Sequence, residues 1–151
     1  MHTYSVDLTI AGDDLDEAEV TTKLGLQPLV FLKKGDPLGP KRRRERSVWS
    51  FDVRPSPDNP EWQSLEDGLR SLVEKLSPLK NELRELRQRY STEAYCGHFG
   101  TGFGGGPSIS AETLRSLADL GLTLTIKTYW GDNQPDEDAK TDERDHREFP
   151  S

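Results

Sequence analysis

The sequence predicts an α+β domain in which a mainly antiparallel sheet carries helices on one face, in a ferredoxin-like arrangement. Three observations support this fold class. Segments near both ends of the chain alternate apolar and polar residues, which is typical of half-buried strands. A stripe of leucines runs through the middle of the chain at helical spacing. A short helix with start and stop signals follows the first strand, and another precedes the last one.

The first predicted strand and helix lie at the start of the chain. Asp16 is the predicted N-cap of the helix, and Glu19, three residues later, completes a capping box. Gly25 ends the helix, because glycine adopts the left-handed backbone of a helix terminus without strain. The preceding strand places four alternate apolar residues on one face: Tyr4, Val6, Leu8 and Ile10.

Residues 27–46 are predicted to be irregular, because they hold three prolines and two glycines. Within them, residues 29–32 form a short strand. The next strand covers residues 47–53 and places Trp49 in the core, since an aromatic side chain on an alternating strand is usually buried.

The middle of the chain predicts one long helix. Asn59-Pro60 is a favourable helix start, because proline suits the first helical position. Apolar residues, most of them leucines, then recur every three or four positions from Trp62 to Tyr90. The stripe continues across Pro78, which predicts a kinked helix or two helices that share an apolar face. A coiled coil is the alternative, but packing on the chain's own sheet is favoured because the strands need a cover.

The second half of the chain repeats the pattern of the first. Residues 92–99 form a strand, and a glycine-rich loop, residues 100–107, follows it. A helix begins at Ser110 and ends at Gly121, and residues 122–127 alternate as the last strand. We therefore interpret the fold as two βαβ-like halves joined by the long kinked central helix.

The domain is expected to cover residues 1–131, followed by a disordered acidic tail, residues 132–151. The tail has eight acids, three bases and a single aromatic residue, Phe149. Such a segment cannot bury enough apolar surface to offset the entropy lost on ordering. Charge is segmented elsewhere too, because residues 33–46 carry a net charge of +5 in a chain whose net charge is −7.

Composition excludes several classes of protein. The single cysteine, Cys96, rules out an intrachain disulfide, and the first residues do not have the pattern of a signal peptide. No apolar run approaches the ~20 residues that span a bilayer. These features predict a cytoplasmic protein. Its acidity argues against general nucleic-acid binding, since most of the surface would repel phosphates.

Several short motifs occur in a characteristic order: Tyr4-Ser-Val-Asp-Leu, Leu24-Gly-Leu-Gln-Pro, Lys34-Gly-Asp36, Ser47-Val-Trp-Ser50, and the tyrosine, glycine and phenylalanine between Tyr95 and Phe99. A helix-Leu-Gly-Leu-strand ending follows them. Through these motifs, residues 3–130 resemble a bacterial family known only as a domain of unknown function, number 4279. The resemblance supports the domain boundaries and implies no catalytic residues.

Two motifs could carry chemistry. Residues 100–105 spell G-x-G-x-x-G, but the next helix starts late and the last strand lacks the acid of a dinucleotide site. A flexible loop is favoured, and a backbone nest for an anion is a second interpretation. Cys96 and His98 share one strand face and could form a nucleophile pair, although a free cysteine is usually buried and inert. Three scattered histidines and one cysteine give no metal-ligand spacing, so neither metal nor cofactor is expected.

The candidate binding residues form two groups. The first is the loop with the basic run 41–44, which could contact phosphate or an acidic partner, or could be a solvated loop. The second group lies opposite Cys96 and His98 on their strand, and would share any open sheet face with Asp7, Thr9, Thr123, Thr125 and Lys127. Because the strands alternate, we expect one sheet face to be wet or covered from outside the domain. The candidates are Lys34, Asp36, Arg42, Arg43, Arg44, Tyr95 and Phe99.

These features predict a non-enzymatic module that binds another protein. Its negative charge, basic loop and open sheet face fit such a role, and an immunity-type protein that caps a toxin is one concrete example by analogy. The alternative is a small-ligand or anion sensor that uses the basic loop and the glycine-rich loop. An enzyme that uses Cys96 or His98 ranks third.

Overall fold

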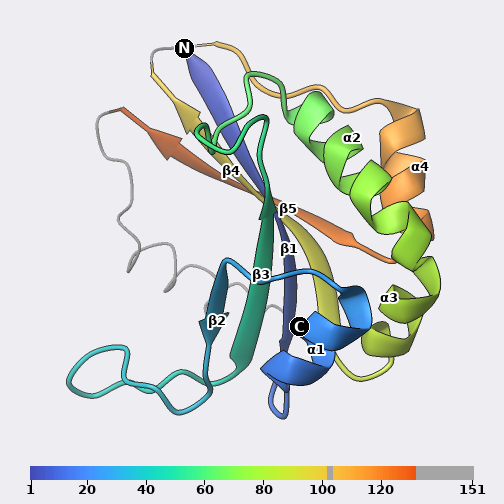
Figure 1. Cartoon of the computed structure of the whole chain (residues 1–151). Coiled ribbons are helices and arrows are strands. Elements are labelled where there is room, and N and C mark those ends of the chain that lie inside the picture. Colours follow the sequence, from blue (N-terminus) through green and yellow to red (C-terminus); the bar gives the residue numbers. More distant parts are fainter. Residues whose placement is uncertain (102–103, 132–151) are drawn as a thin grey trace.

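The computed structural model describes residues 1–101 and 104–131, which form one five-stranded sheet with helices on one face (Figure 1). The strand order is β2-β3-β1-β4-β5. The strands are β1 (His2–Gly12), β2 (Val30–Leu32), β3 (Ser47–Val53), β4 (Ser91–Gly100) and β5 (Thr123–Trp130). The helices are α1 (Glu17–Leu24), α2 (Leu65–Leu76), α3 (Lys80–Arg87) and α4 (Ala111–Asp119). The predicted α+β class is confirmed.

The sheet is mainly antiparallel, as predicted. β1 pairs antiparallel with both β3 and β4, and β2 pairs antiparallel with β3. Among the strands that the structure describes, only the neighbours β4 and β5 are parallel, and α4 connects them. The strands of this second strand-helix-strand unit are neighbours, whereas in the first unit β3 lies between β1 and β2.

The predicted helix start at Asn59-Pro60 is wrong, because a residue that follows it pairs with a strand of the sheet. Trp62 exchanges two backbone hydrogen bonds with Tyr4, of 2.8 and 2.7 Å, and so extends the pairing of β1. The helix begins only after Ser64, whose Oγ accepts a hydrogen bond of 3.2 Å from the Asp67 amide. Pro78 lies in a short 3₁₀ turn, Ser77–Leu79, which divides the predicted long helix into α2 and α3. Proline lacks the amide hydrogen that a continuous helix needs at this point.

We expect the Ser64→Ala variant to lose about 1 kcal/mol of the free energy of unfolding, because an amide at the start of α2 loses its cap. Urea unfolding followed by circular dichroism measures the loss. Ser77→Ala is the matched control, since the Ser77 hydroxyl donates to the Val73 carbonyl and caps no helix start. An equal loss in both variants would contradict the assigned helix start.

The ends of α1 are capped partly as predicted. Asp16 accepts a hydrogen bond of 3.0 Å from the Ala18 amide, and Gly25 has the left-handed backbone, with φ of 66°. The predicted capping box is wrong, because Glu19 turns to the end of the central helical segment instead. Its carboxylate accepts hydrogen bonds from Arg89, at 2.5 Å, and from the Tyr90 hydroxyl, at 2.9 Å. These bonds lower the pKa of Glu19, and an arginine partner binds a carboxylate more strongly than a backbone amide does.

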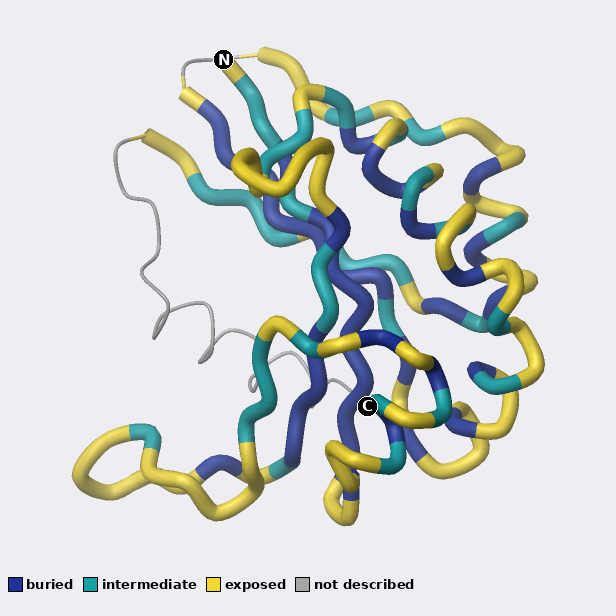
Figure 2. Tube along the Cα trace, viewed as in Figure 1, coloured by how far each residue is buried: buried dark blue, intermediate teal, exposed yellow. Residues whose placement is uncertain are grey.

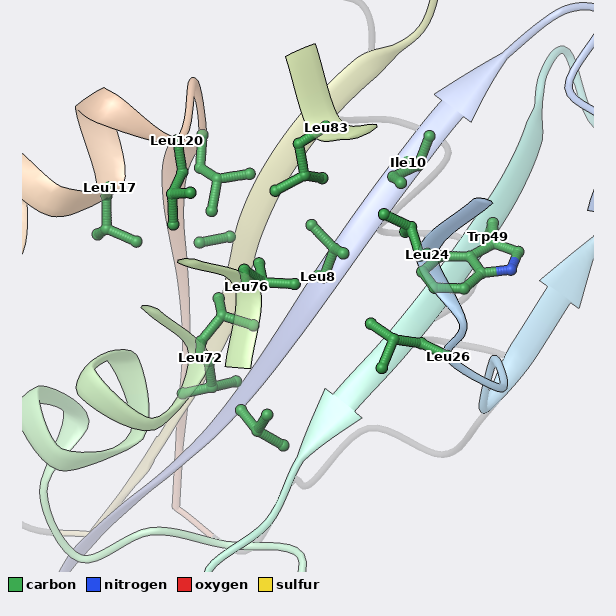
Figure 3. Close-up of a cluster of buried hydrophobic side chains, with 14 of the residues drawn as sticks. Leu8, Ile10, Leu24, Leu26, Trp49, Leu72, Leu76, Leu83, Leu117 and Leu120 are labelled. Atoms are coloured by element: carbon green, nitrogen blue, oxygen red, sulfur yellow. The ribbon is translucent and has the colours of Figure 1, made fainter. Parts of the chain in front are cut away.

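The core lies between the sheet and the helices (Figure 3). Trp49 is fully buried against α1, and its indole nitrogen donates a hydrogen bond of 3.0 Å to Thr21. Most of the leucine stripe is also buried as predicted, on α2 and α3, and Leu117 of α4 joins the same core. The central strands are buried over most of their length, whereas the loop between β2 and β3 is mostly exposed (Figure 2). Among the described residues, no helix is long and apolar enough to cross a membrane. The predicted tail, residues 132–151, lies outside the described residues.

Candidate functional site

The basic loop between β2 and β3, residues 33–46, forms no helix or strand, as predicted, but backbone hydrogen bonds fold it into a narrow hairpin. The Arg44 amide donates to the Asp36 carbonyl at 2.8 Å, and the Leu38 amide donates to the Arg42 carbonyl at 2.9 Å. Arg42 and Arg43 are exposed at its tip, whereas Arg44 is buried, with 5% of its surface exposed. The hairpin projects away from the helices (Figure 1). It therefore presents Arg42 and Arg43 to solvent, and Arg44 is not part of that exposed surface.

Lys34 and Asp36 lie near the base of this hairpin. Lys34 Nζ is 4.0 Å from a carboxylate oxygen of Asp13, and both side chains are largely exposed. Beside Lys34 is an open depression of about 570 Å³ that is lined by equal numbers of acids and bases: Asp13, Asp14, Glu45, Lys34, Arg46 and Arg89. Because the charges balance, this depression does not select an anion.

The structure does not bring the basic loop and the glycine-rich loop together. The basic loop joins β2 to β3 at the Gly12 end of β1, where Gly12 pairs with Ser47. The glycine-rich loop follows Gly100, which pairs with His2 at the opposite end. Residues 102–103 of this loop lie outside the described residues.

Tyr95 and Phe99 lie on the sheet face opposite the helices, which we call the far face. In the strand register, Tyr95 pairs with Asp7 and Thr125, and Phe99 pairs with Thr3 and Tyr129. Cys96 and His98 pair with Val6 and Tyr4 on the helix-covered face. The far face thus contains every residue that the sequence placed with Tyr95 and Phe99: Asp7, Thr9, Thr123, Thr125 and Lys127.

The expectation that this face is wet is wrong at its aromatic residues. Tyr95 and Phe99 are only 4% and 6% exposed. Phe99 stacks on Tyr129, with ring centroids 5.4 Å apart and an angle of 14° between the planes. Stacked, buried rings are firmly placed, so this part of the far face is a preformed surface.

Cys96 and His98 do not form a nucleophile pair. Both nitrogens of the His98 ring lie near other partners, His2 at 2.9 Å and Thr128 at 3.3 Å. Cys96 is fully buried, and burial raises the pKa of its thiol, with smaller contributions from the charges of Asp7 and Glu93. A thiol with a raised pKa is rarely ionised, and the thiolate is the nucleophile.

We expect Cys96 to resist iodoacetamide in the native protein and to react once urea unfolds the chain. Mass spectrometry of the alkylated protein measures both rates. The Cys96→Ala variant should lose about 1 kcal/mol of the free energy of unfolding, the cost of a small buried side chain. Rapid alkylation of the native protein would contradict the buried role.

A cluster of rings that the sequence did not reveal surrounds His98. Nδ1 of His2 is 2.9 Å from Nε2 of His98, and this hydrogen bond requires at least one neutral ring. His98 stacks on Tyr4, with ring centroids 4.8 Å apart, and the edge of Trp130 approaches it. Gly105 packs so closely on His2 that an added Cβ would lie 2.6 Å from Nε2. The pairing of β1 and β5 with β4 brings these rings together, so no local pattern could predict the cluster.

This cluster predicts a loss of stability in mild acid. Burial lowers the pKa of His98 below its ordinary value of 6.5, and the charge of His2 lowers it further. The unfolded chain therefore binds a proton at His98 more readily than the folded chain does. The stabilisation is complete above pH ~6.5 and is lost as the pH falls through that value toward the lowered pKa of the folded state.

Urea unfolding between about pH 7.5 and 5.5 tests this prediction. The His98→Phe variant is the comparison, since it keeps a ring on Tyr4 but cannot be protonated. We expect the free energy of unfolding to fall more steeply with acid in the parent protein than in this variant. Equal slopes would show that His98 does not contribute.

A comparison with known families identifies the family of the chain. Residues 2–131 match the family described as a domain of unknown function, DUF4279. The chain belongs to this family. The match confirms the resemblance that the short motifs indicated. No curated protein and no solved structure matches the chain.

The motifs of this DUF4279 domain mainly serve the fold. Leu24 is buried and Gly25 ends α1 in the left-handed region. Gly35 also has a positive φ, of 92°, in the basic hairpin, and Trp49 is in the core. Among the described residues, no group of three or more His, Cys, Asp or Glu side chains could hold a metal ion.

Proposed function

We propose that the chain is a non-enzymatic module that binds another protein through the far face of its sheet. One observation carries the proposal: α1 to α4 all lie on the opposite face, yet the far face also holds large apolar side chains. Val30, Leu32 and Tyr129 are partly exposed on this face, and the buried Tyr95, Phe99 and Val48 lie on the same face. Aromatic and aliphatic side chains bordered by polar groups are typical of contact surfaces.

The charge of the chain suits a basic partner. At a net charge of −7, the protein attracts basic proteins over long range, which raises the rate of association. An immunity-type protein, which caps a toxin, is the concrete role that we propose by analogy. The setting is the cytoplasm, where a reducing environment suits a chain with one buried cysteine.

The geometry supports the anion sensor less well. That function needs the basic loop and the glycine-rich loop at one site, and they lie at opposite ends of β1. The enzyme is also supported less well, because His98 bonds to His2 and Thr128 and not to Cys96.

Photo-crosslinking in the native host tests the proposal. A photoreactive phenylalanine replaces Thr125 on the far face in one variant and Arg84 on α3 in the matched control. We expect a crosslinked partner from position 125 and none from position 84. In binding measurements with that partner, Thr125→Arg should accelerate dissociation, because buried contacts mainly set that rate.

In the same binding measurements, substitutions in the basic hairpin should change the rate of association rather than the rate of dissociation. If Arg42 and Arg43 steer an acidic region of the partner, replacing them with serine should slow association and flatten its dependence on salt. Unchanged rates in both the far-face and the hairpin variants would show that neither surface is the binding site.

We also infer that β1 to β4, with α1 and the α2–α3 segment, form a ferredoxin-like core that α4 and β5 extend. The order β2-β3-β1-β4 supports this, because β3 lies between the two strands that α1 connects.

A further inference from the structure

Two hydroxyl groups on the far face lack hydrogen-bond partners although they are buried. Thr9 and Ser50 pair with each other on the neighbouring strands β1 and β3. They are 1% and 0% exposed, and within the described residues neither side-chain oxygen has a partner. Since α1 to α4 lie on the other face, no described helix covers these groups. Buried polar groups are rarely left unsatisfied, so this face is suited to receive another stretch of polypeptide.

The chain itself supplies a segment of suitable charge. Residues 132–151 carry a net charge of −5, and the basic hairpin, residues 33–46, carries a net charge of +5. Acids are spread along most of this C-terminal segment, and Phe149 lies near its end. Segments rich in charge and poor in apolar residues can become ordered when they bind a complementary surface.

The segment is also long enough to reach the hairpin across the far face. It starts beyond Trp130, which lies beside Gly100 and His2 at one end of the sheet, whereas the hairpin lies at the other end. The 11 residues of β1 span roughly 36 Å at about 3.3 Å per residue. Twenty extended residues reach roughly 66–72 Å, about twice that span. Because the segment and the hairpin belong to one molecule, the effective concentration of the segment at the hairpin is about millimolar.

We propose that residues 132–151 bind back across the far face, with their acids against the basic hairpin, and that a partner protein must displace them. This inference rests on the proposed function, because it assigns the regulation of the same surface. The segment then acts as an internal competitor that a partner must displace from the far face.

A spin label at the end of the full-length chain tests the contact. In the Ser151→Cys variant the nitroxide attaches there alone, because Cys96 is fully buried. We expect the label to broaden the amide signals of residues 33–46 and of the far-face strands, and reduction of the label to restore them. Salt at about 1 M should weaken the broadening, because the Debye length falls to about 3 Å.

Paired charge reversals identify the surface that holds the segment. Arg42→Glu with Arg43→Glu should remove the broadening in the hairpin. The matched control, Lys80→Glu with Arg84→Glu on α3, makes the same change of net charge and should leave it intact. All four side chains are exposed, and circular dichroism checks that both variants fold.

Absence of broadening overturns the inference, as does an equal loss in both charge-reversed variants. Broadening that appears only between labelled and isotope-enriched molecules in a mixture also overturns it, because the contact is then between copies. These outcomes leave the proposed function standing, since that depends on the crosslink from position 125. If the label broadens the far face but no partner crosslinks there, the proposed function fails and the internal contact remains.

Discussion

Replacing Trp49 by alanine is expected to lower the free energy of unfolding by about 3–5 kcal/mol. Trp49 is fully buried between β3 and α1, and its ring also stacks near Phe51, with centroids 6.5 Å apart. Its removal leaves a cavity that the surrounding strands cannot close, and Thr21 loses a hydrogen-bond donor. Urea unfolding at neutral pH measures the loss.

Trp130→Ala is the matched control for this prediction. Trp130 is 51% exposed at the end of β5, so the same substitution removes fewer buried contacts. We expect this variant to lose about 1 kcal/mol or less. If the two tryptophan variants unfold at the same urea concentration, the packing of Trp49 does not stabilise α1 on the sheet.

Replacing Gly68 by valine should lower the free energy of unfolding by about 2–3 kcal/mol, near the upper end of the usual cost of overpacking. Gly68 lies on the buried side of α2, where an added Cβ would be 2.7 Å from a methyl group of Val6 and 3.1 Å from the Trp62 ring. These neighbours belong to the sheet side of the core and cannot move away freely. Valine forms helices better than glycine does, so local propensity alone predicts the opposite sign.

Gly106→Val controls for the added side chain. An added Cβ at Gly106 meets no atom within 4 Å, and its backbone is not in the left-handed region. Thermal unfolding should show a clearly lower melting temperature for Gly68→Val and little change for Gly106→Val. A stabilised Gly68→Val protein would show that α2 does not approach β1 so closely.

The core was predictable because it is encoded in local patterns. Alternation identified the buried face of β1, and helical spacing identified the leucines of α2, α3 and α4. The N-caps Asp16 and Ser110 were also predictable from the sequence, because an N-cap side chain accepts a hydrogen bond from an amide only two or three residues away. The start of α2 was not predictable from the sequence. Trp62 forms backbone hydrogen bonds with Tyr4, 58 residues earlier in the chain, so the helix begins after it.

The candidate site was predictable only as a set of residues. Strand alternation placed Tyr95 and Phe99 together on one face, opposite Cys96, and the register agrees. Contacts between distant segments decide the rest. They bury Tyr95, Phe99 and Arg44, and they stack Phe99 on Tyr129. The alternation of residues within one strand does not predict such contacts.

By itself, the sequence determined the α+β class, most of the helices and strands, and which strand residues share a face, because backbone geometry fixes these locally. It also indicated the family to which the chain belongs. Only the tertiary structure decided which ends of the strands meet. That pairing joins His2 to His98 and separates the basic hairpin from the glycine-rich loop by the length of β1. Strand order is set by how the helices and strands bury their apolar faces together, and this is a property of the whole domain.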